Sequence, residues 1–350
     1  MNPFAAVTRG LTEPNRLSDR LREAGPVVVA DAPAGGPVWI VTDEELAKQV
    51  LSDPRIVKDP AMAPADWDPL VAGLEPPASA FPSLTTVDGP RHTELRRAHT
   101  PLLTGKRIRE QTGRIEQIAR DMLAAQPNGV VDLMVHFTIR YPLTVLLDLL
   151  GIPLDKLDAT VVACRRLVEG DQSGAIPALM EIAGTAGDDG LAAELRGRLP
   201  EGTPEQEVRY HLFGLIFAGQ VTTDAALGFV IAHALGAPDG DPVEDALRRY
   251  TPAPFSLWRF TSEPLEINGV SLPARAPVLV DLVGLGLTFG SGPHFCIGAQ
   301  LAQAEMRALV TVLRRDFPEA RLAVPFDELV QIGVGGIGGT RLRELPVSLR

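Results

Sequence analysis

The chain has 350 residues, of which 33 are basic and 44 acidic, so its formal net charge at pH 7 is −11. This acidic balance argues against a protein that binds nucleic acid without sequence preference, because such proteins need a basic face. It also argues against adsorption to an anionic membrane. Hydrophobic residues make up 45% and charged residues 22% of the chain, a composition typical of a globular protein that is long enough to enclose a sizeable ligand.

Two cysteines, Cys164 and Cys296, are too few for a disulfide framework or a four-cysteine zinc site. The N-terminal residues lack the apolar segment of a secretory signal peptide, so we expect a cytoplasmic protein. Residues 212–237 form the most apolar stretch but include Asp224, and a central aspartate costs about 3 kcal/mol in a membrane. We therefore expect this stretch to be a buried helix.

In chain order, β-rich runs at 26–30 and 37–41 predict a hairpin, and Thr42 before three acidic residues predicts the N-cap of a helix. Residues 58–84, rich in proline and alanine, are expected to form a loop. The remaining predicted helices cover 92–125, 140–150, 156–169, 190–199, 204–235, 242–250 and 298–315, and further strands are predicted within 265–272, 277–283 and 345–349. No strand–helix–strand alternation is present, so the predicted fold is mainly α with small β elements.

Residues 287–305, LTFGSGPHFCIGAQLAQAE, carry the most chemical information. Two glycines and a proline before Cys296 predict a tight loop, and the small residues after it predict a helix. The cysteine therefore precedes a helix N-terminus, where backbone N–H groups and the helix dipole stabilise a thiolate. Small residues on the following turn let a flat, wide ligand approach closely. A thiolate beside a planar ligand is what haem ligation requires, although a lone cysteine is more often a buried structural residue.

This loop resembles the haem-binding loop of the cytochrome P-450 family. The matching positions are Phe289, Gly290, Gly292, His294, Cys296 and Gly298. The resemblance implies that Cys296 is the axial ligand of the iron in haem b and that His294 contacts a haem propionate. It also implies that Phe289, Gly290 and Gly298 are cofactor-binding residues.

Other segments resemble the same family in the same order along the chain. Residues 88–97 resemble the start of its helix C, which implies that His92 and Arg96 pair with propionates, and Arg259 matches another propionate-binding position. Buried carboxylates need cationic partners, so the physics agrees. Residues 218–223 resemble the helix that crosses over the haem, which implies catalytic roles for Gly219, which leaves room, and for Thr222, which contacts bound oxygen.

The resemblance implies a single haem domain over residues 1–350 and a monooxygenase that oxidises a small apolar or natural-product substrate. Dioxygen would be the oxidant, and a ferredoxin-like partner would supply electrons.

Three departures from the family pattern bear on this expectation. The acid that normally precedes the oxygen-side threonine is Val221, which cannot relay a proton, and Asp224 lies on a different helix face. The usual Glu-x-x-Arg pair appears as Asp245 and Arg248, which can still pair on a helix. The chain also lacks most of the helix J region, the meander before the haem loop and part of the pocket roof.

These losses keep two alternatives open. One is a non-catalytic auxiliary protein that stabilises or activates a partner enzyme such as a glycosyltransferase, although the retained Cys296 favours haem. The other is a haem enzyme that uses peroxide or catalyses a rearrangement. A Gly-x-Gly-x-x-Gly pattern at 333–338 does not indicate a nucleotide site, because too few residues follow it for the required helix.

Overall fold

The computed structural model describes residues 2–237, 239–333 and 335–350. Helices form most of the ordered structure, and they are α1 (Arg16–Ala24), α2 (Glu44–Val50), α3 (Pro69–Ala72), α4 (Gly89–His99), α5 (Gly105–Ala124), α6 (Leu133–His136), α7 (Arg140–Leu150), α8 (Leu157–Val168), α9 (Gln172–Ala183), α10 (Gly190–Arg198), α11 (Glu205–Gly236), α12 (Pro242–Arg249), α13 (Leu282–Leu285) and α14 (Ala299–Asp316). Short 3₁₀ turns cover Pro60–Met62, Thr100–Leu103, Leu154–Lys156, Gly292–His294 and Phe326–Glu328.

The strands are short and make small sheets at the edges of the helical body. Their bounds are β1 (Val7–Gly10), β2 (Val27–Asp31), β3 (Pro37–Val41), β4 (Ile56–Val57), β5 (Val130–Asp132), β6 (Arg259–Thr261), β7 (Leu265–Ile267), β8 (Val270–Leu272), β9 (Pro277–Val280), β10 (Arg321–Leu322), β11 (Val330–Gly333), β12 (Thr340–Leu342) and β13 (Pro346–Ser348). The largest sheet has the order β2-β3-β9-β6-β4, with β3 and β9 parallel.

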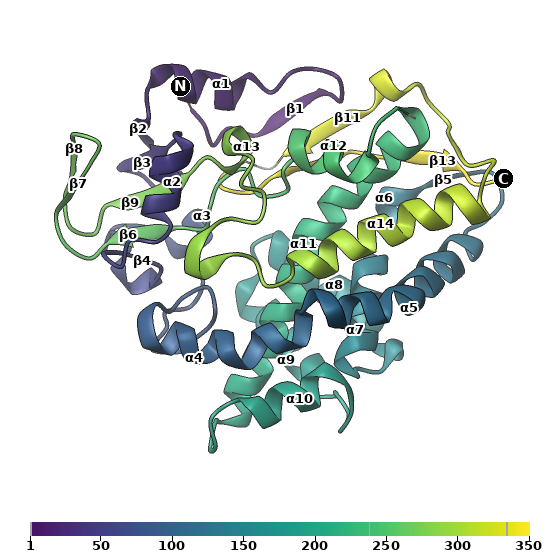
Figure 1. The fold of residues 1–350 in the computed structure, drawn as a ribbon, viewed down its shortest axis with the longest axis horizontal. Helices are drawn as coiled ribbons and strands as arrows, with labels where there is room; N and C mark the ends of the chain where they lie inside the picture. Colours follow the sequence, from purple (N-terminus) through teal and green to yellow (C-terminus); the bar gives the residue numbers. More distant parts are fainter. Residues whose placement is uncertain (1, 238, 334) are drawn as a thin grey trace.

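Segments from opposite ends of the chain pair with each other. Strand β1 runs antiparallel to β11, with Val7 opposite Gly333, and β13 runs antiparallel to β5. Figure 1 shows the N-terminal residues and the strands near the C-terminus meeting along one side of the molecule. Two of the small sheets are therefore built from strands that lie far apart in the sequence.

Helix α11 runs through the middle of the helical body, where it packs against α7, α9, α12 and α14 (Figure 1). Two stretches, Leu133–Leu150 and Glu205–Gly236, have the length and hydropathy of a membrane span, but 72% and 61% of their apolar windows are buried inside the fold. They are core helices of this molecule, as expected for residues 212–237.

The 26–41 hairpin and the predicted helices are confirmed, except that the 92–125 range is divided into α4 and α5 by the 3₁₀ turn Thr100–Leu103, which contains Pro101. Asp43, not Thr42, caps α2, because its side chain accepts a hydrogen bond from the N–H of Leu46 at 2.9 Å. Helix α9 was not predicted, because Gly174 and Pro177 interrupt its apolar pattern. Residues 58–84 are mostly loop, as expected, apart from Pro60–Met62 and α3.

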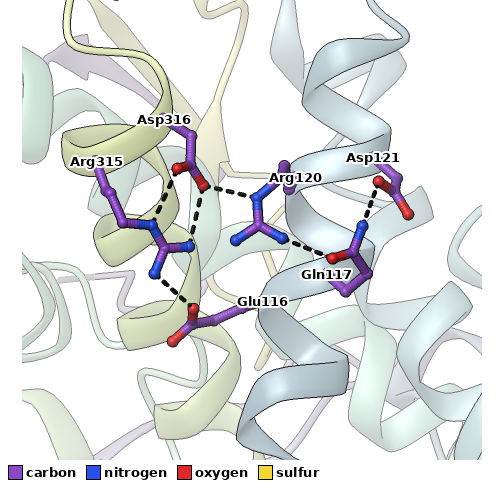
Figure 2. Close-up of polar contacts among 6 residues, drawn as sticks. All are labelled: Glu116, Gln117, Arg120, Asp121, Arg315 and Asp316. Carbon is purple, nitrogen blue, oxygen red and sulfur yellow. Dashed lines mark hydrogen bonds and ion pairs between the residues drawn. The ribbon is translucent and has the colours of Figure 1, made fainter.

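A network of charged side chains joins α5 to α14 (Figure 2). Asp316 accepts hydrogen bonds from Arg315 and from Arg120, the latter at 2.8 Å, and Arg315 also reaches Glu116 at 3.1 Å. Hydrogen bonds from Arg315 and Arg120 lower the pKa of Asp316 to about 2. The network fixes the C-terminal end of the helix whose N-terminal end follows Cys296.

The glycines of α11 provide a matched test of its packing. A Cβ atom on Gly219 would lie 2.9 Å from Cδ1 of Leu146 in α7, whereas a Cβ on Gly214 would meet nothing within 4 Å. We expect Gly219→Ala to lower the free energy of unfolding by about 1–3 kcal/mol through overpacking. Gly214→Ala should raise it by roughly 0.5–1 kcal/mol, because alanine loses less backbone entropy. Urea unfolding measures both, and an equal effect of the two substitutions would contradict this packing.

Candidate functional site

The loop that carries Cys296 is closed by its own backbone. Gly290 and Gly292 have φ angles of +72° and +70°, which side-chain-bearing residues rarely adopt. The N–H of Cys296 donates to the carbonyl of Phe289 at 2.9 Å, which folds the loop back on itself. A Cβ on Gly292 would lie 2.6 Å from Oγ of Ser52, so the loop also packs closely on the end of α2. The glycine spacing thus sets where the thiol is presented.

Solvent reaches the Cys296 side chain, while protein atoms surround its sulfur closely. Burial raises the pKa of the thiol, and the N–H groups of Gly298 and Ala299 and the charge of Arg96 only partly offset this. The sequence-based expectation of a thiolate stabilised by the helix N-terminus is therefore incomplete, because the donors are present but burial outweighs them. Binding of a cation at the sulfur would displace the proton. A Cβ on Gly298 would lie 3.8 Å from Sγ, an ordinary van der Waals contact, so space at the sulfur does not by itself require glycine here.

Two buried basic side chains near this loop have nitrogens without hydrogen-bond partners. His92 and Arg259 are each 4% exposed, and His92 Nε2 and Arg259 Nε are unpartnered. Burial lowers the pKa of Arg259 to about 10 and that of His92 to about 4. A buried guanidinium and a buried neutral imidazole without partners are both costly, and a ligand carboxylate can accept hydrogen bonds from both, so this arrangement fits a ligand that brings carboxylates. The two propionates of a haem meet that requirement.

His294 is already engaged with protein groups. Its Nε2 lies 2.8 Å from Oδ1 of Asp88, and its Nδ1 lies 3.1 Å from the carbonyl oxygen of Leu84. Its ring centre is 3.9 Å from that of His92. Burial lowers the pKa of His294 and the hydrogen bond to Asp88 opposes that shift. His294 therefore ties the Cys296 loop to the start of α4 and supports His92 from one side.

Arg96 forms a second link between α4 and the loop. Its Nη1 donates to the carbonyl of Phe295 at 2.8 Å, one residue before Cys296. Because Arg96 also lowers the thiol pKa, its guanidinium acts on both the position and the ionisation of the sulfur. The structure thus brings His92, Arg96, His294 and Cys296 together, as the motif predicted.

Helix α11 is buried on most sides but has one partly accessible face. The residues on this face that are not fully buried are Gly214, Leu215, Ala218, Val221, Thr222 and Ala225. Their spacing of three and four residues places them along one stripe. The Thr222 hydroxyl donates to the carbonyl of Ala218 at 3.3 Å, so it lies in the groove of the helix on this stripe. The stripe forms an apolar wall with one hydroxyl.

Two residues near Thr222 have roles set by packing. The open side of Gly219 faces Leu146 of α7, so the room this glycine leaves is filled by a neighbouring helix. Asp224 is 8% exposed, and its Oδ2 lies 3.6 Å from Nη2 of Arg341. Two residues along a helix rotate a side chain by about 200°. Asp224 therefore points away from Thr222 and does not replace the missing acid at Val221.

The predicted Asp245–Arg248 pair is present. Nη2 of Arg248 lies 2.5 Å from Oδ1 of Asp245, and the Arg248 side chain is 65% exposed, so the pair lies at the surface. Beside it is a hollow of about 360 Å³, lined by Leu247 and by residues of the Cys296 loop, including Phe289 and Phe295. Phe295 is 44% exposed. The hollow lies behind the loop, on the side where the sequence lacks a meander.

Sequence reasoning missed one buried charge at this site. Lys58 is 7% exposed, and its backbone N–H donates to Oδ2 of Asp88 at 2.7 Å. The only signal was a lysine directly after the β-branched pair Ile56–Val57, at the start of a segment predicted to be loop. Within the described ranges, no group of three or more His, Cys, Asp and Glu side chains could hold a metal ion.

Comparison with known proteins places this chain in a family. It is 38% identical over 412 aligned positions to the cytochrome P-450 monooxygenase DoxA of Streptomyces peucetius subsp. caesius, covering 100% of this chain and 98% of the relative. It is 30% identical to the cytochrome P450 monooxygenase PikC of Streptomyces venezuelae, and the alignment covers 95% of this chain and 90% of PikC. The structure of the tirandamycin C-bound P450 monooxygenase TamI superposes with a TM-score of 0.80 at 26% identity, and the match covers 95% of this chain and 96% of TamI. No family model matches the chain.

The chain belongs to the cytochrome P-450 family. It is a haem-thiolate monooxygenase, and its cofactor is haem b. The alignment with DoxA spans 412 positions against 350 residues here, so the relative has insertions that this chain lacks. Family membership and the retained loop disfavour the non-catalytic and peroxide-only alternatives.

Cysteine alkylation tests the electrostatics of the loop. In haem-free protein carrying Cys164→Ala, we expect the alkylation rate of Cys296 to rise with pH and to reach its midpoint above the ordinary thiol value, because burial raises its pKa. Arg96→Gln should move that midpoint further up. The reciprocal Cys296→Ala variant is the control, because Cys164 is fully buried with a pKa of about 12 and should react far more slowly. A midpoint below the ordinary value would contradict the assignment.

Proposed function

We propose that this chain holds haem b between α11 and the Cys296 loop and uses it to oxidise a small apolar substrate of natural-product type. The observation that carries the proposal is the set of unpartnered buried nitrogens on His92 and Arg259 beside a solvent-reachable thiol. The nitrogens could donate hydrogen bonds to the carboxylates of a haem, and the thiol, once deprotonated, could coordinate its iron. Neither feature is needed by a protein without this cofactor.

Each residue then has a distinct task. Cys296 supplies the thiolate, and Phe289, Gly290 and Gly298 shape the loop so that a planar ligand reaches it. Arg259 and His92 neutralise the carboxylates, while Arg96 and His294 hold the loop against α4. When bound, the haem supplies the activation of dioxygen, which a thiolate ligand favours by donating electron density.

Thr222 is the polar group of the α11 stripe. Its hydroxyl donates a hydrogen bond to the carbonyl of Ala218, and we assign it the task of steadying dioxygen when the haem is bound. Val221 beside it supplies no proton, and Asp224 faces Arg341 on another side of the helix. Neither neighbour therefore offers Thr222 an acidic partner on the accessible face.

The substrate class follows from the wall that the substrate would meet. Apart from Thr222, the stripe carries Leu215, Val221 and small residues, which favour an apolar molecule. One turn before this stripe, buried Tyr210 stacks on the partly exposed Phe81, with 4.5 Å between the ring centres. The named relatives DoxA and PikC are monooxygenases of Streptomyces, and TamI is described with tirandamycin C bound, which supports a natural product of secondary metabolism.

We infer that the electron donor is an acidic, ferredoxin-type protein. Arg97, Lys106 and Arg109 are exposed at the junction of α4 and α5. Gln300, in the first turn after the Cys296 loop, and Arg109 both lie beside Gly105, which places this basic surface next to the loop. A basic patch on a chain with net charge −11 suits an acidic partner.

We also infer a single haem domain over residues 1–350 that works in the cytoplasm. The pairing of β1 with β11 and of β5 with β13 supports one unit, because both ends of the chain contribute to shared sheets. Burial of the two most apolar helical stretches supports a protein that does not reside in a membrane.

The decisive test is the absorption spectrum of purified protein, oxidised and then reduced with dithionite under carbon monoxide. We expect the red-shifted Soret band typical of thiolate-ligated haem, and Cys296→Ser should abolish that shift. Cys164→Ser is the matched control and should leave the spectrum unchanged. Absence of any Soret band after expression with a haem precursor would overturn the proposal.

A second experiment tests the partner surface. Reversing the charge of Lys106 and Arg109 together to glutamate should slow reduction by an acidic ferredoxin about tenfold or more at low salt, because electrostatic steering sets the encounter rate. The difference should shrink as ionic strength rises. Reversal of Arg140, on α7, is the control. Equal reduction rates for the variant and the parent at low salt would exclude this surface.

A further inference from the structure

Lys58 and Arg259 occupy facing positions on neighbouring strands. Strand β4 pairs with β6 so that Ile56 lies opposite Thr261 and Val57 opposite Phe260. Continuing this antiparallel register by one residue sets Lys58 opposite Arg259. Lys58 is 7% exposed and Arg259 is 4% exposed. Like charges that face each other across a sheet destabilise it, and burial increases the repulsion.

The acids close to Lys58 are committed to other groups. Both oxygens of Asp88 accept hydrogen bonds, one from the backbone N–H of Lys58 and the other from His294. Glu75 accepts the hydroxyl of Thr85 at 2.6 Å. In the part of the chain that the structure describes, the Lys58 ammonium has no hydrogen bond or ion pair.

The charges around Lys58 come from every element packed on it. Arg259 lies on β6, Asp88 and His92 at the start of α4, His294 on the Cys296 loop and Glu75 after α3. Burial, and then the charge of Arg259, lower the pKa of Lys58 to about 7, and the two acids only partly offset this. Negative charge is therefore present near Lys58, but both acids are engaged with other groups and neither pairs with its ammonium.

We propose that Lys58 and Arg259 jointly bind one carboxylate of the haem, which makes Lys58 a cofactor-binding residue of this chain. The inference rests on the haem site proposed above. A carboxylate between the two cations would cancel their repulsion and give the orphan Nε of Arg259 a partner. Without that anion, the buried charge of Lys58 lowers the stability of the fold. The anion would offset this cost.

This reasoning predicts opposite effects on cofactor retention and on stability. Lys58→Met keeps the side-chain length and removes the charge. It should speed the loss of haem to apomyoglobin about tenfold or more, because one charge-assisted hydrogen bond is removed. The same variant should melt at a higher temperature than the parent when both are haem-free. A residue with only a packing role would shift both readouts in the same direction.

Two variants sharpen the experiment. Lys58→Arg keeps the charge and should retain haem close to the parental rate. Arg55→Met, three residues earlier on an exposed side chain paired with Asp53, is the matched control and should change neither readout. The inference would be overturned if Lys58→Met lost haem at the same rate as the parent protein. It would also be overturned if the variant lost haem faster and its haem-free form melted at a lower temperature.

The pH dependence gives an independent check. Anion binding raises the pKa of Lys58, so the haem-bound protein holds more protons and haem affinity should fall as pH rises above about 7. Lys58→Arg should flatten this slope, because arginine stays charged. His92 and His294 are neutral in this range, since their pKa values are lowered. An unchanged slope in Lys58→Arg would contradict the role of Lys58, whereas a parent protein that takes up no haem would refute the proposed function itself.

Discussion

Two buried cationic side chains that lack direct partners among the described residues are the constraint on which the rest of this structure depends. Lys58 and Arg259 are nearly inaccessible to solvent, and the nearby acids, Asp88 and Glu75, already accept hydrogen bonds from the Lys58 backbone, His294 and Thr85. A protein without a ligand has no reason to accumulate such charge, because each buried cation loses its hydration. Two carboxylates of a bound cofactor would offset the energetic cost of burying these cations.

The backbone around this charge is arranged to deliver one sulfur atom. Left-handed glycines turn the loop, the carbonyl of Phe289 closes it, and Arg96 and His294 attach it to α4. The ion-pair network of Figure 2 then holds the far end of α14 on α5. The thiol thus sits on an element that is fixed at both ends, although its own surroundings keep it protonated until a cation arrives.

Much of this could be predicted from the sequence, because the informative residues lie close together along the chain. The loop around Cys296 and the start of α4 each carry a dense local pattern. Lys58 could not be found in this way, since its significance arises from the pairing of β4 with β6, whose residues are far apart in sequence. The same applies to Gly219, because only the packing of α11 on α7 shows that its open side meets Leu146. The local sequence pattern singled out Cys296 as the candidate ligand. The buried charge of Lys58 facing Arg259 could be recognised only from tertiary contacts.

The pairing of the chain ends has a consequence for how the protein is made. Strand β1 is translated long before its partner β11, because Val7 pairs with Gly333. The residues that would bind the cofactor are all translated before β11 can pair with β1. During synthesis the N-terminal strand therefore has an unpaired edge, which is a hazard for aggregation. The cofactor residues and the edge of β1 are therefore both exposed in the growing chain until β11 is made.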